Sequence, residues 1–406
     1  MPRTRNKKTG LTTAPAATLY ALYLTIFLFA LHYALPLYIS SSFLSQFFSQ
    51  KTLGLLYAAS SLILIFLFVQ MPRILKTFGA LRTTLAFILL EIASLAGLAY
   101  GESALTVALV FIANQALVSL IFFNFDVFFE TFSKDATTGT VRGIMLTVFN
   151  VAILLGPLLA GIILTNGDYF KVFLVSAALL VPALWIFFVH FSTFKDSKYK
   201  KVAYIETVRD IILARHPKDE IRHALVASLL MRFFYSWMII YTPLYLHGDL
   251  GFSWSAIGTI FTIMLLPFVL FEAAVGAFAD ARSNEPTVMR VGFLIAAVFT
   301  GILPFVGSSS LALWAVLLFG TRVGISFVEV ASESYFFKHV TSADTNALSV
   351  FRNANPVAFL IGPALASLLL LFMPMQYLFL VLALVLLYGA VSIGRPKKKT
   401  AARANS

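Results

Sequence analysis

The chain has 406 residues, of which 60% are hydrophobic and only 12% are charged, and its formal net charge is +12. A soluble domain carries about 25% charged residues, so this chain has roughly half the charge of a protein that water surrounds. The composition argues against an aqueous enzyme and a nucleic-acid binder, and zero cysteines exclude disulfides and thiolate metal sites. We therefore predict an all-α polytopic membrane protein.

Apolar stretches long enough to cross a bilayer, which takes about 20 residues, recur from end to end of the chain. Short polar breaks such as 101–103, 166–168 and 308–310 separate the most continuous stretches. The first stretch runs for roughly 24 residues, too long for the ~7–15 of a cleavable signal, so we expect it to be retained. The twelve predicted transmembrane helices are 16–39, 52–72, 82–100, 104–128, 144–165, 169–191, 224–246, 254–278, 288–306, 311–334, 346–372 and 376–394.

Basic residues give the predicted orientation, because Lys and Arg are held on the cytoplasmic side during insertion. With the N-terminus inside, most of the 30 Lys and Arg residues fall in inner segments, whereas Lys51 and Lys171 fall in outer turns. We therefore predict cytoplasmic N- and C-termini and a multi-pass location in the inner or plasma membrane of the cell. The positive charge follows from this topology, so it indicates no nucleic-acid partner.

The longest polar segment, 193–222, divides the predicted helices into six and six. Apolar residues recur in it at helical spacing from Val202 to Ile212, which predicts an amphipathic helix under the membrane or, alternatively, a helix that binds a partner. The predicted organisation is a cytoplasmic tail at 1–15, a six-helix bundle at 16–192, the linker at 193–222, a second six-helix bundle at 223–394 and a basic cytoplasmic tail at 395–406.

The two predicted bundles repeat short sequence landmarks at nearly one offset. The matched pairs are Pro36 and Pro243, Gly54 and Gly258, Gly156-Pro157 and Gly362-Pro363, and Tyr169 and Tyr377. Because each half has an even number of helices, the two copies share one topology and are related by an axis along the membrane normal. The sequence thus predicts two pseudo-symmetric six-helix bundles.

Local motifs accompany this organisation. Gly276 and Asp280 are followed by Arg282, while the first copy of this loop keeps Gly79 but has Lys76 at the acidic position. After the fourth helix, Glu130 precedes Arg142-Gly143, and the fifth helix carries Gly156-Pro157-Leu-Leu-Ala160-Gly161. With twelve spans in two parallel copies, the chain resembles the major facilitator superfamily (MFS) of secondary transporters. The resemblance implies alternating access to a small organic solute, coupled to protons and similar to drug or metabolite efflux.

Ionisable groups within spans are functional candidates, because the bilayer makes them costly. Arg322 falls near mid-bilayer, and Ser326, Glu329 and Glu333 follow it on the same helical face. Arg322 has no charged counterpart in the first half, so we predict that it faces an anionic or strongly hydrogen-bonding substrate. The alternative is that it is a structural partner of Glu329.

A second group of charged residues clusters near the predicted cytoplasmic ends of the helices. We predict an ion-pair network that closes these ends and breaks on opening, and the alternative is direct handling of substrate or protons. Its members are Arg82, Asp126, Glu130, Arg142, Arg232, Glu272, Asp280, Glu329, Glu333 and Arg352.

His32 and Glu91 lie within the first and third predicted helices. The proton-coupling candidates are His32, Glu91 and Glu329. A histidine such as His32 titrates near neutral pH, so it could relay protons. Simple hydrogen bonding is the alternative for both residues. The substrate-binding candidates are Arg322, Ser326, His32, Asn114, Gln115, Asn150, Tyr235 and Trp237.

The sequence contains no phosphate-binding loop, nucleophile elbow or paired-histidine metal motif. We therefore expect no enzyme activity, metal or cofactor. The expected partners are a small-molecule substrate, protons and membrane lipids, and the expected state is a monomer. Two alternatives stay open: a uniporter of a small metabolite, and a sensor or scaffold on the same fold that transports nothing.

Overall fold

The computed structural model describes residues 16–132, 138–164, 167–192, 194, 219–282, 284–339, 351 and 354–393. All regular structure within these ranges is helical. The predicted linker helix and both predicted tails lie outside the described residues. Of the predicted linker at 193–222, the structure describes only residue 194 and residues 219–222, which begin the seventh long helix.

The N-terminal half contains α1 (Ala16–Leu37), the short α2 (Ser40–Leu44), α3 (Gln50–Phe78), α4 (Ala80–Ala99), α5 (Ala104–Phe132), α6 (Thr138–Ile163) and α7 (Tyr169–His190). The C-terminal half contains α9 (Asp219–Leu244), a π-helical turn (Tyr245–Asp249), α10 (Trp254–Arg282), α11 (Glu285–Ile302), a 3-10 turn (Leu303–Phe305), α12 (Leu311–His339), α14 (Ala354–Leu369) and α15 (Tyr377–Ser392).

Ten of these helices are long and apolar enough to cross a membrane, and α14 and α15 are shorter apolar helices. Large apolar side chains such as Phe66, Trp185 and Val391 are exposed on the outer surface of the molecule. A helix satisfies its own backbone hydrogen bonds, so it can present such side chains to lipid. The predicted class of multi-pass helical membrane protein is confirmed.

Several helices extend beyond the predicted apolar stretches. Helix α3 continues to Phe78 rather than ending at 72, and α12 continues to His339 rather than 334. Polar residues can prolong a helix past the bilayer, so hydropathy locates the apolar part of a helix and not its end. Gly79 ends α3 with φ of 79°, in the left-handed region that favours glycine, and this turn leads directly into α4.

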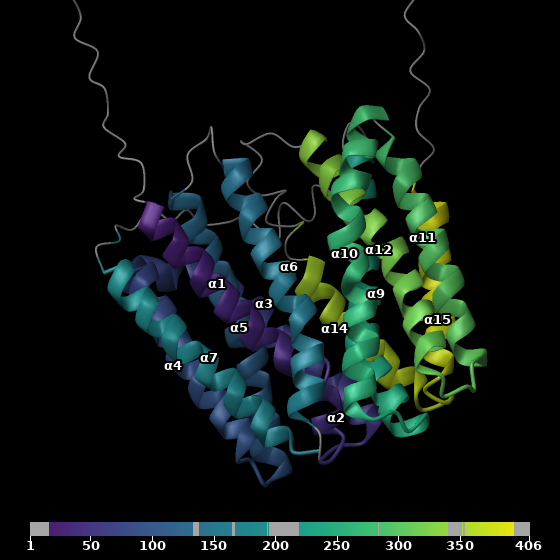
Figure 1. The fold of residues 1–406 in the computed structure, drawn as a ribbon, viewed down its shortest axis with the longest axis horizontal. Helices are drawn as coiled ribbons and strands as arrows, with labels where there is room; N and C mark the ends of the chain where they lie inside the picture. The colour runs from purple at the N-terminus through teal and green to yellow at the C-terminus, as the bar shows by residue number, and fades with distance from the viewer. Residues whose placement is uncertain are drawn as a thin grey trace, which may run out of the picture.

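Each half packs mainly on itself, and the halves meet mainly along two pairs of long helices, with a smaller contact between α2 and α9 (Figure 1). In the N-terminal half, α1 packs on α6 and α7, and α4 packs on α5 and α7. In the C-terminal half, α9 packs on α12 and α14, and α11 lies against α12 and α15. Across the halves, α3 packs on α14 and α6 packs on α10.

The two crossings between halves use the landmarks that the sequence repeats. A Cβ on Gly54 of α3 would collide with the carbonyl oxygen of Pro363 and the Oγ of Ser367 on α14. A Cβ on Gly258 of α10 would lie only 2.5 Å from the carbonyl oxygen of Pro157 on α6. The glycine of each half therefore meets the proline of the other half, and close backbone approach requires glycine at both places.

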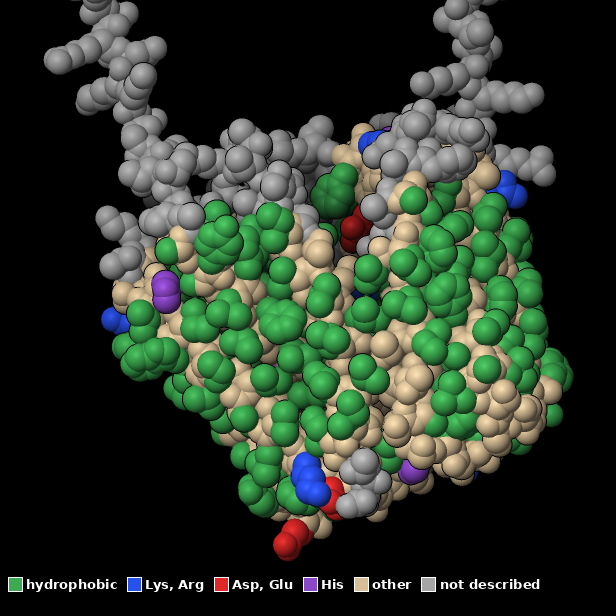
Figure 2. All heavy atoms as spheres, viewed as in Figure 1, with side chains coloured by type: hydrophobic (Ala, Val, Ile, Leu, Met, Phe, Trp, Pro, Cys, Tyr) green, Lys and Arg blue, Asp and Glu red, His purple; other side chains and the backbone are tan. Residues whose placement is uncertain are grey.

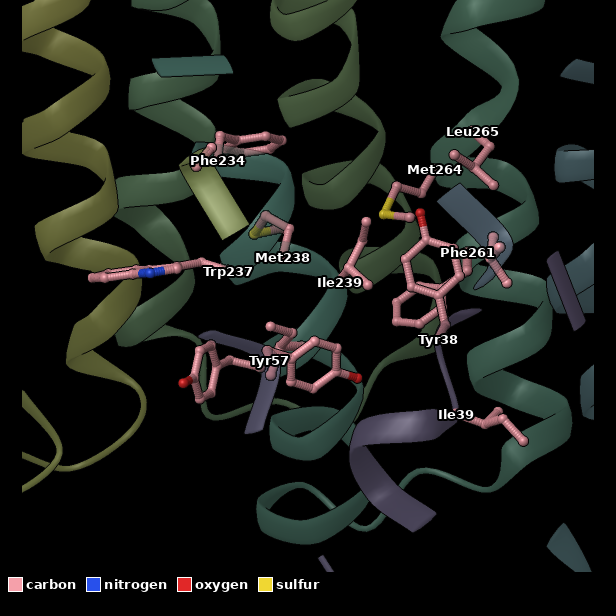
Figure 3. Close-up of a cluster of buried hydrophobic side chains, with 14 of the residues drawn as sticks. Tyr38, Ile39, Tyr57, Phe234, Trp237, Met238, Ile239, Phe261, Met264 and Leu265 are labelled. Atoms are coloured by element: carbon pink, nitrogen blue, oxygen red, sulfur yellow. The ribbon is translucent and has the colours of Figure 1, made fainter. Parts of the chain in front are cut away.

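Buried side chains from both halves fill the space between them near α2 (Figure 3). Tyr38, which follows α1, packs against Phe261 of α10 with ring centroids 4.8 Å apart. Trp237 of α9 donates a hydrogen bond from its indole nitrogen to the Gly362 carbonyl of α14 at 2.7 Å. The molecule is thus tightly packed near α2. Toward the opposite end, Figure 2 shows a hollow between the halves with acidic side chains set back inside it.

Candidate functional site

A buried polar cluster joins three helices of the N-terminal half. The His32 Nε2 atom of α1 lies 3.3 Å from Glu91 Oε1 of α4, and Asn114 Nδ2 of α5 donates to the same oxygen at 2.6 Å. Ser94 donates to the other carboxyl oxygen, Oε2, at 3.2 Å and accepts from Asn114 at 3.1 Å. His32 is 1% exposed and Glu91 is not exposed at all. We refer to these four residues as the His32 cluster.

Neighbouring backbone groups fix the imidazole of His32. Its Nδ1 lies 2.5 Å from the carbonyl oxygen of Phe29, which can only accept, so Nδ1 carries a proton. The contact between Nε2 and Glu91 is then attractive only if a second proton lies between them, on either atom. The pair is neutral overall with this proton and has a buried charge of −1 without it. The geometry therefore places one proton between His32 Nε2 and Glu91 Oε1.

The sequence identified three members of this cluster separately and missed the fourth. It gave His32 and Glu91 as proton-coupling candidates and Asn114 as a substrate candidate, and the structure brings all three together. Ser94 was missed, although its place one helical turn after Glu91 was a usable signal. Gln115 and Asn150 are half-buried, and no described hydrogen bond joins them to the cluster.

The C-terminal half contains a buried cation, Arg322 of α12. Its side chain has no exposure, and none of Nε, Nη1 and Nη2 has a hydrogen-bond partner among the described residues. The guanidinium carbon lies 4.8 Å from the ring centroid of Phe234 and 5.4 Å from that of Tyr235, both on α9. The Tyr38 hydroxyl lies close enough to interact electrostatically, although not in hydrogen-bond geometry.

Glu329, about two turns along the same face of α12 from Arg322, has other partners. Its Oε2 accepts a hydrogen bond from the Tyr235 hydroxyl at 2.8 Å, and its Oε1 lies 3.9 Å from Nη2 of Arg232. Arg232 and Glu329 are both partly exposed, at 30% and 22% of their side-chain surface. The structure thus pairs Glu329 with Arg232 and Tyr235 rather than with Arg322.

Residues 17–331 and, in a second match, 224–405 match the Major Facilitator Superfamily. The chain belongs to the Major Facilitator Superfamily. A search of the curated proteins finds no match. Family membership and the apolar helices together identify this MFS protein as a multi-pass membrane transporter, and members of this family are typically transporters rather than enzymes.

Two further substrate candidates of this MFS protein use their polar atoms within the protein. Ser326 is buried and donates to the Val323 carbonyl of its own helix at 2.9 Å. Trp237 is bound to Gly362 in the packed region near α2. Both side chains therefore have a hydrogen-bond partner within the MFS protein in this conformation.

The predicted ion-pair network is described only in part. Its Arg232 and Glu329 are brought together, while Arg82 is exposed and Asp126 and Glu333 are half-buried. The side chains of Glu130, Arg142, Glu272 and Asp280, and all of Arg352, lie outside the described residues. The structure adds a pair that the sequence did not indicate, between Lys338 at the end of α12 and the buried Glu285 at the start of α11.

In the part of the chain that the structure describes, no group of three or more His, Asp or Glu side chains could hold a metal ion. The two polar features described above are a carboxyl–imidazole pair in one half and a guanidinium in the other.

Proposed function

We propose that this protein is a secondary active transporter that moves a small organic solute by alternating access, coupled to protons. In this proposal twelve transmembrane helices form two six-helix bundles, at 16–192 and 223–394, and the protein works as a monomer in the cell membrane with both termini in the cytoplasm. Family membership supports transport, and the separate packing of the two halves supports movement of one against the other.

The asymmetry between the two ends of the molecule supports alternating access. The halves are packed together near α2 through the Gly54 and Gly258 crossings, and a hollow separates them toward the opposite end (Figure 2). With the α2 end outside, as the basic residues predict, this conformation is open to the cytoplasm. Rocking about the central region would open the α2 end and close the hollow.

The observation that carries proton coupling is the buried pair of His32 and Glu91. An ionisable pair within the bilayer is costly and is found where protons or ions move. The same helix, α1, carries His32 and leads directly to Tyr38, which packs on α10 of the other half. A change in the protonation of the pair can therefore alter the position of α1 at the contact between the halves.

The test is solute accumulation in proteoliposomes under an imposed pH gradient. A thermal-shift screen of purified protein against metabolites and drugs first identifies a ligand, because specific binding stabilises the folded state. The Glu91→Gln variant keeps the shape of the side chain but cannot release the proton. We expect it to retain exchange of solute across the membrane and to lose accumulation driven by the pH gradient.

The matched control is Glu102→Gln, which removes an exposed carboxylate from the turn between α4 and α5 and should accumulate solute normally. Wild-type accumulation that ignores the pH gradient would reject proton coupling and favour a uniporter. Ligand binding without any flux would favour a sensor or scaffold.

A further inference from the structure

Arg322 is a cation buried within a membrane-spanning helix without a hydrogen-bond partner among the described residues. All three of its guanidinium nitrogens are buried, and none is satisfied. A buried charge is stable in a protein only when it is paired, so a lone guanidinium is a costly feature. Functional need is the usual reason for such a residue within a span.

The described surroundings leave the positive charge uncompensated. Phe234 and Tyr235 offer only the faces of their rings, which attract a cation weakly. The nearby carboxylate of Glu329 is occupied by Arg232 and by the Tyr235 hydroxyl. The charges of Arg232 and Glu329 cancel each other, so the net charge of these two residues and Arg322 together is the single positive charge of Arg322.

The shape of a guanidinium decides which anion fits best. Its planar fork of N–H groups matches the two oxygens of a carboxylate and forms two parallel hydrogen bonds. A single uncompensated charge favours a ligand with one negative charge. The Tyr38 hydroxyl, contributed by the other half, interacts electrostatically with the guanidinium, so it lies near any ligand that Arg322 binds.

Apolar side chains lie near Arg322 and Tyr38. Phe234, Met238, Met264 and Leu265 lie with Tyr38 in one buried cluster between the halves (Figure 3). Methionine side chains adapt to ligands of different shape. A site lined by these apolar side chains favours a ligand with an apolar body over a sugar or a peptide.

We propose that Arg322 binds the carboxylate of a small organic monoanion whose apolar body packs against this cluster. The inference deepens the proposed function, because it names the substrate class of the transporter. On its way to Arg322 the carboxylate passes the partly exposed Arg232 and Glu329 and then Tyr235, which donates to Glu329. Because Tyr38 and Arg322 belong to different halves, a bound carboxylate links the halves.

Direct binding tests the proposal without any gradient or membrane flux. The probes are benzoate and hexanoate, the neutral isosteres benzamide and hexanamide, and the cations benzylammonium and hexylammonium. Thermal shift and isothermal titration calorimetry of purified full-length protein at constant ionic strength measure their binding. We expect stabilisation by one or both carboxylates and by neither the amides nor the cations.

Substitutions at Arg322 connect this binding to the guanidinium. Arg322→Gln should weaken carboxylate binding on the order of 30-fold or more, because the ligand charge then lacks its partner. Arg322→Lys should retain weaker binding, since it keeps the charge and loses the fork. The matched control is Arg290→Gln on α11, which removes a half-buried arginine that donates to the Ala390 carbonyl, and it should bind like the wild type.

Ligand-free stability provides a second measurement that separates binding from structure. If Arg322 serves a ligand, Arg322→Gln raises the melting temperature of the ligand-free protein, because it removes an unpaired buried charge. A structural role predicts a lower melting temperature, and that result would overturn the proposal.

Equal binding of amides and carboxylates, unchanged binding by Arg322→Gln, or no stabilisation of the wild type by either carboxylate would also overturn it. Carboxylate binding that persists in a protein without pH-driven accumulation would leave this inference intact and reject the proposed coupling.

Discussion

The polar groups buried in the two halves differ in how completely they are satisfied. In the N-terminal half, the carboxyl group of Glu91 has partners on both oxygens, from His32, Asn114 and Ser94. In the C-terminal half, no guanidinium nitrogen of Arg322 has a hydrogen-bond partner among the described residues. The halves repeat the same landmarks and cross in the same way, so this difference lies in the side chains and not in the crossings.

From this difference we infer that the two halves have different roles in transport. A fully hydrogen-bonded cluster, with one proton shared between His32 and Glu91, suits a group that exchanges nothing larger than a proton. A buried guanidinium without a partner, as at Arg322, suits a residue that binds an anionic ligand. Substitutions that remove the charge from each half should therefore change stability in opposite directions.

Glu91→Ala is expected to have the largest effect. It leaves His32, Asn114 and Ser94 without their common partner in a dry interior and should destabilise the protein by about 3–5 kcal/mol. Thermal unfolding in detergent measures this loss. Glu102→Ala, which removes an exposed carboxylate from the adjacent turn, should stay within about 0.5 kcal/mol of the wild type. A small effect of Glu91→Ala would mean that the cluster is hydrated.

Arg322→Leu should have the opposite sign. The change removes an unpaired buried charge, so it should stabilise the ligand-free protein by about 1–4 kcal/mol, less the cost of the cavity that the shorter leucine leaves. The same thermal unfolding measurement applies, and the variant should no longer respond to carboxylates. Destabilisation would show that Arg322 is paired in the ligand-free protein and that the contrast between the halves is wrong.

Gly54→Ala and Gly258→Ala test the two glycine crossings at which the halves pack together. Each added Cβ collides with the backbone of the other half, so each variant should disfavour the closed α2 end by about 1–3 kcal/mol. The chain has no cysteine, so Gln46→Cys and Ser253→Cys, at exposed positions of opposite halves near α2, accept spin labels cleanly. We expect longer distances between the labels in both glycine variants.

Similar effects of the two glycine variants would show that both crossings contribute equally to closing the α2 end. An effect at only one crossing would show that the repeated landmarks do not act as a pair.

Tyr235→Phe should have the smallest effect. It deletes the hydroxyl that donates to Glu329 but keeps the ring beside Arg322, so the expected destabilisation is about 1 kcal/mol. Carboxylate binding should change little. A loss of binding as large as that of Arg322→Gln would assign the hydroxyl, and not the ring, to the ligand site.

Much of the fold could be predicted because the bilayer restricts the choice of structure. Ranges such as 82–100 and 169–191 agree within two residues with α4 (Ala80–Ala99) and α7 (Tyr169–His190). Helix ends beyond the apolar stretch, as at Phe78 and His339, could not be predicted, because hydropathy stops where the helix still continues. The short α2 and the π-helical turn at Tyr245–Asp249 gave no periodic signal.

The candidate site was predictable as a set of residues and not as an arrangement. His32, Glu91 and Arg322 were identifiable because each is an ionisable group in an apolar stretch. Their partners were not, since His32 and Glu91 are 59 residues apart and their contact depends on how α1 and α4 are rotated and displaced. Packing against neighbouring helices sets that rotation.

By itself, the sequence determined that the chain crosses a membrane repeatedly as helices, that its halves repeat, and which few charged residues the bilayer should have excluded. Hydropathy and spacing suffice for these, because they are properties of single segments. Only the tertiary structure decided that Glu91 is satisfied by three partners while Arg322 is satisfied by none among the described residues. That distinction depends on atoms brought together from different helices, and helix packing alone determines which atoms meet.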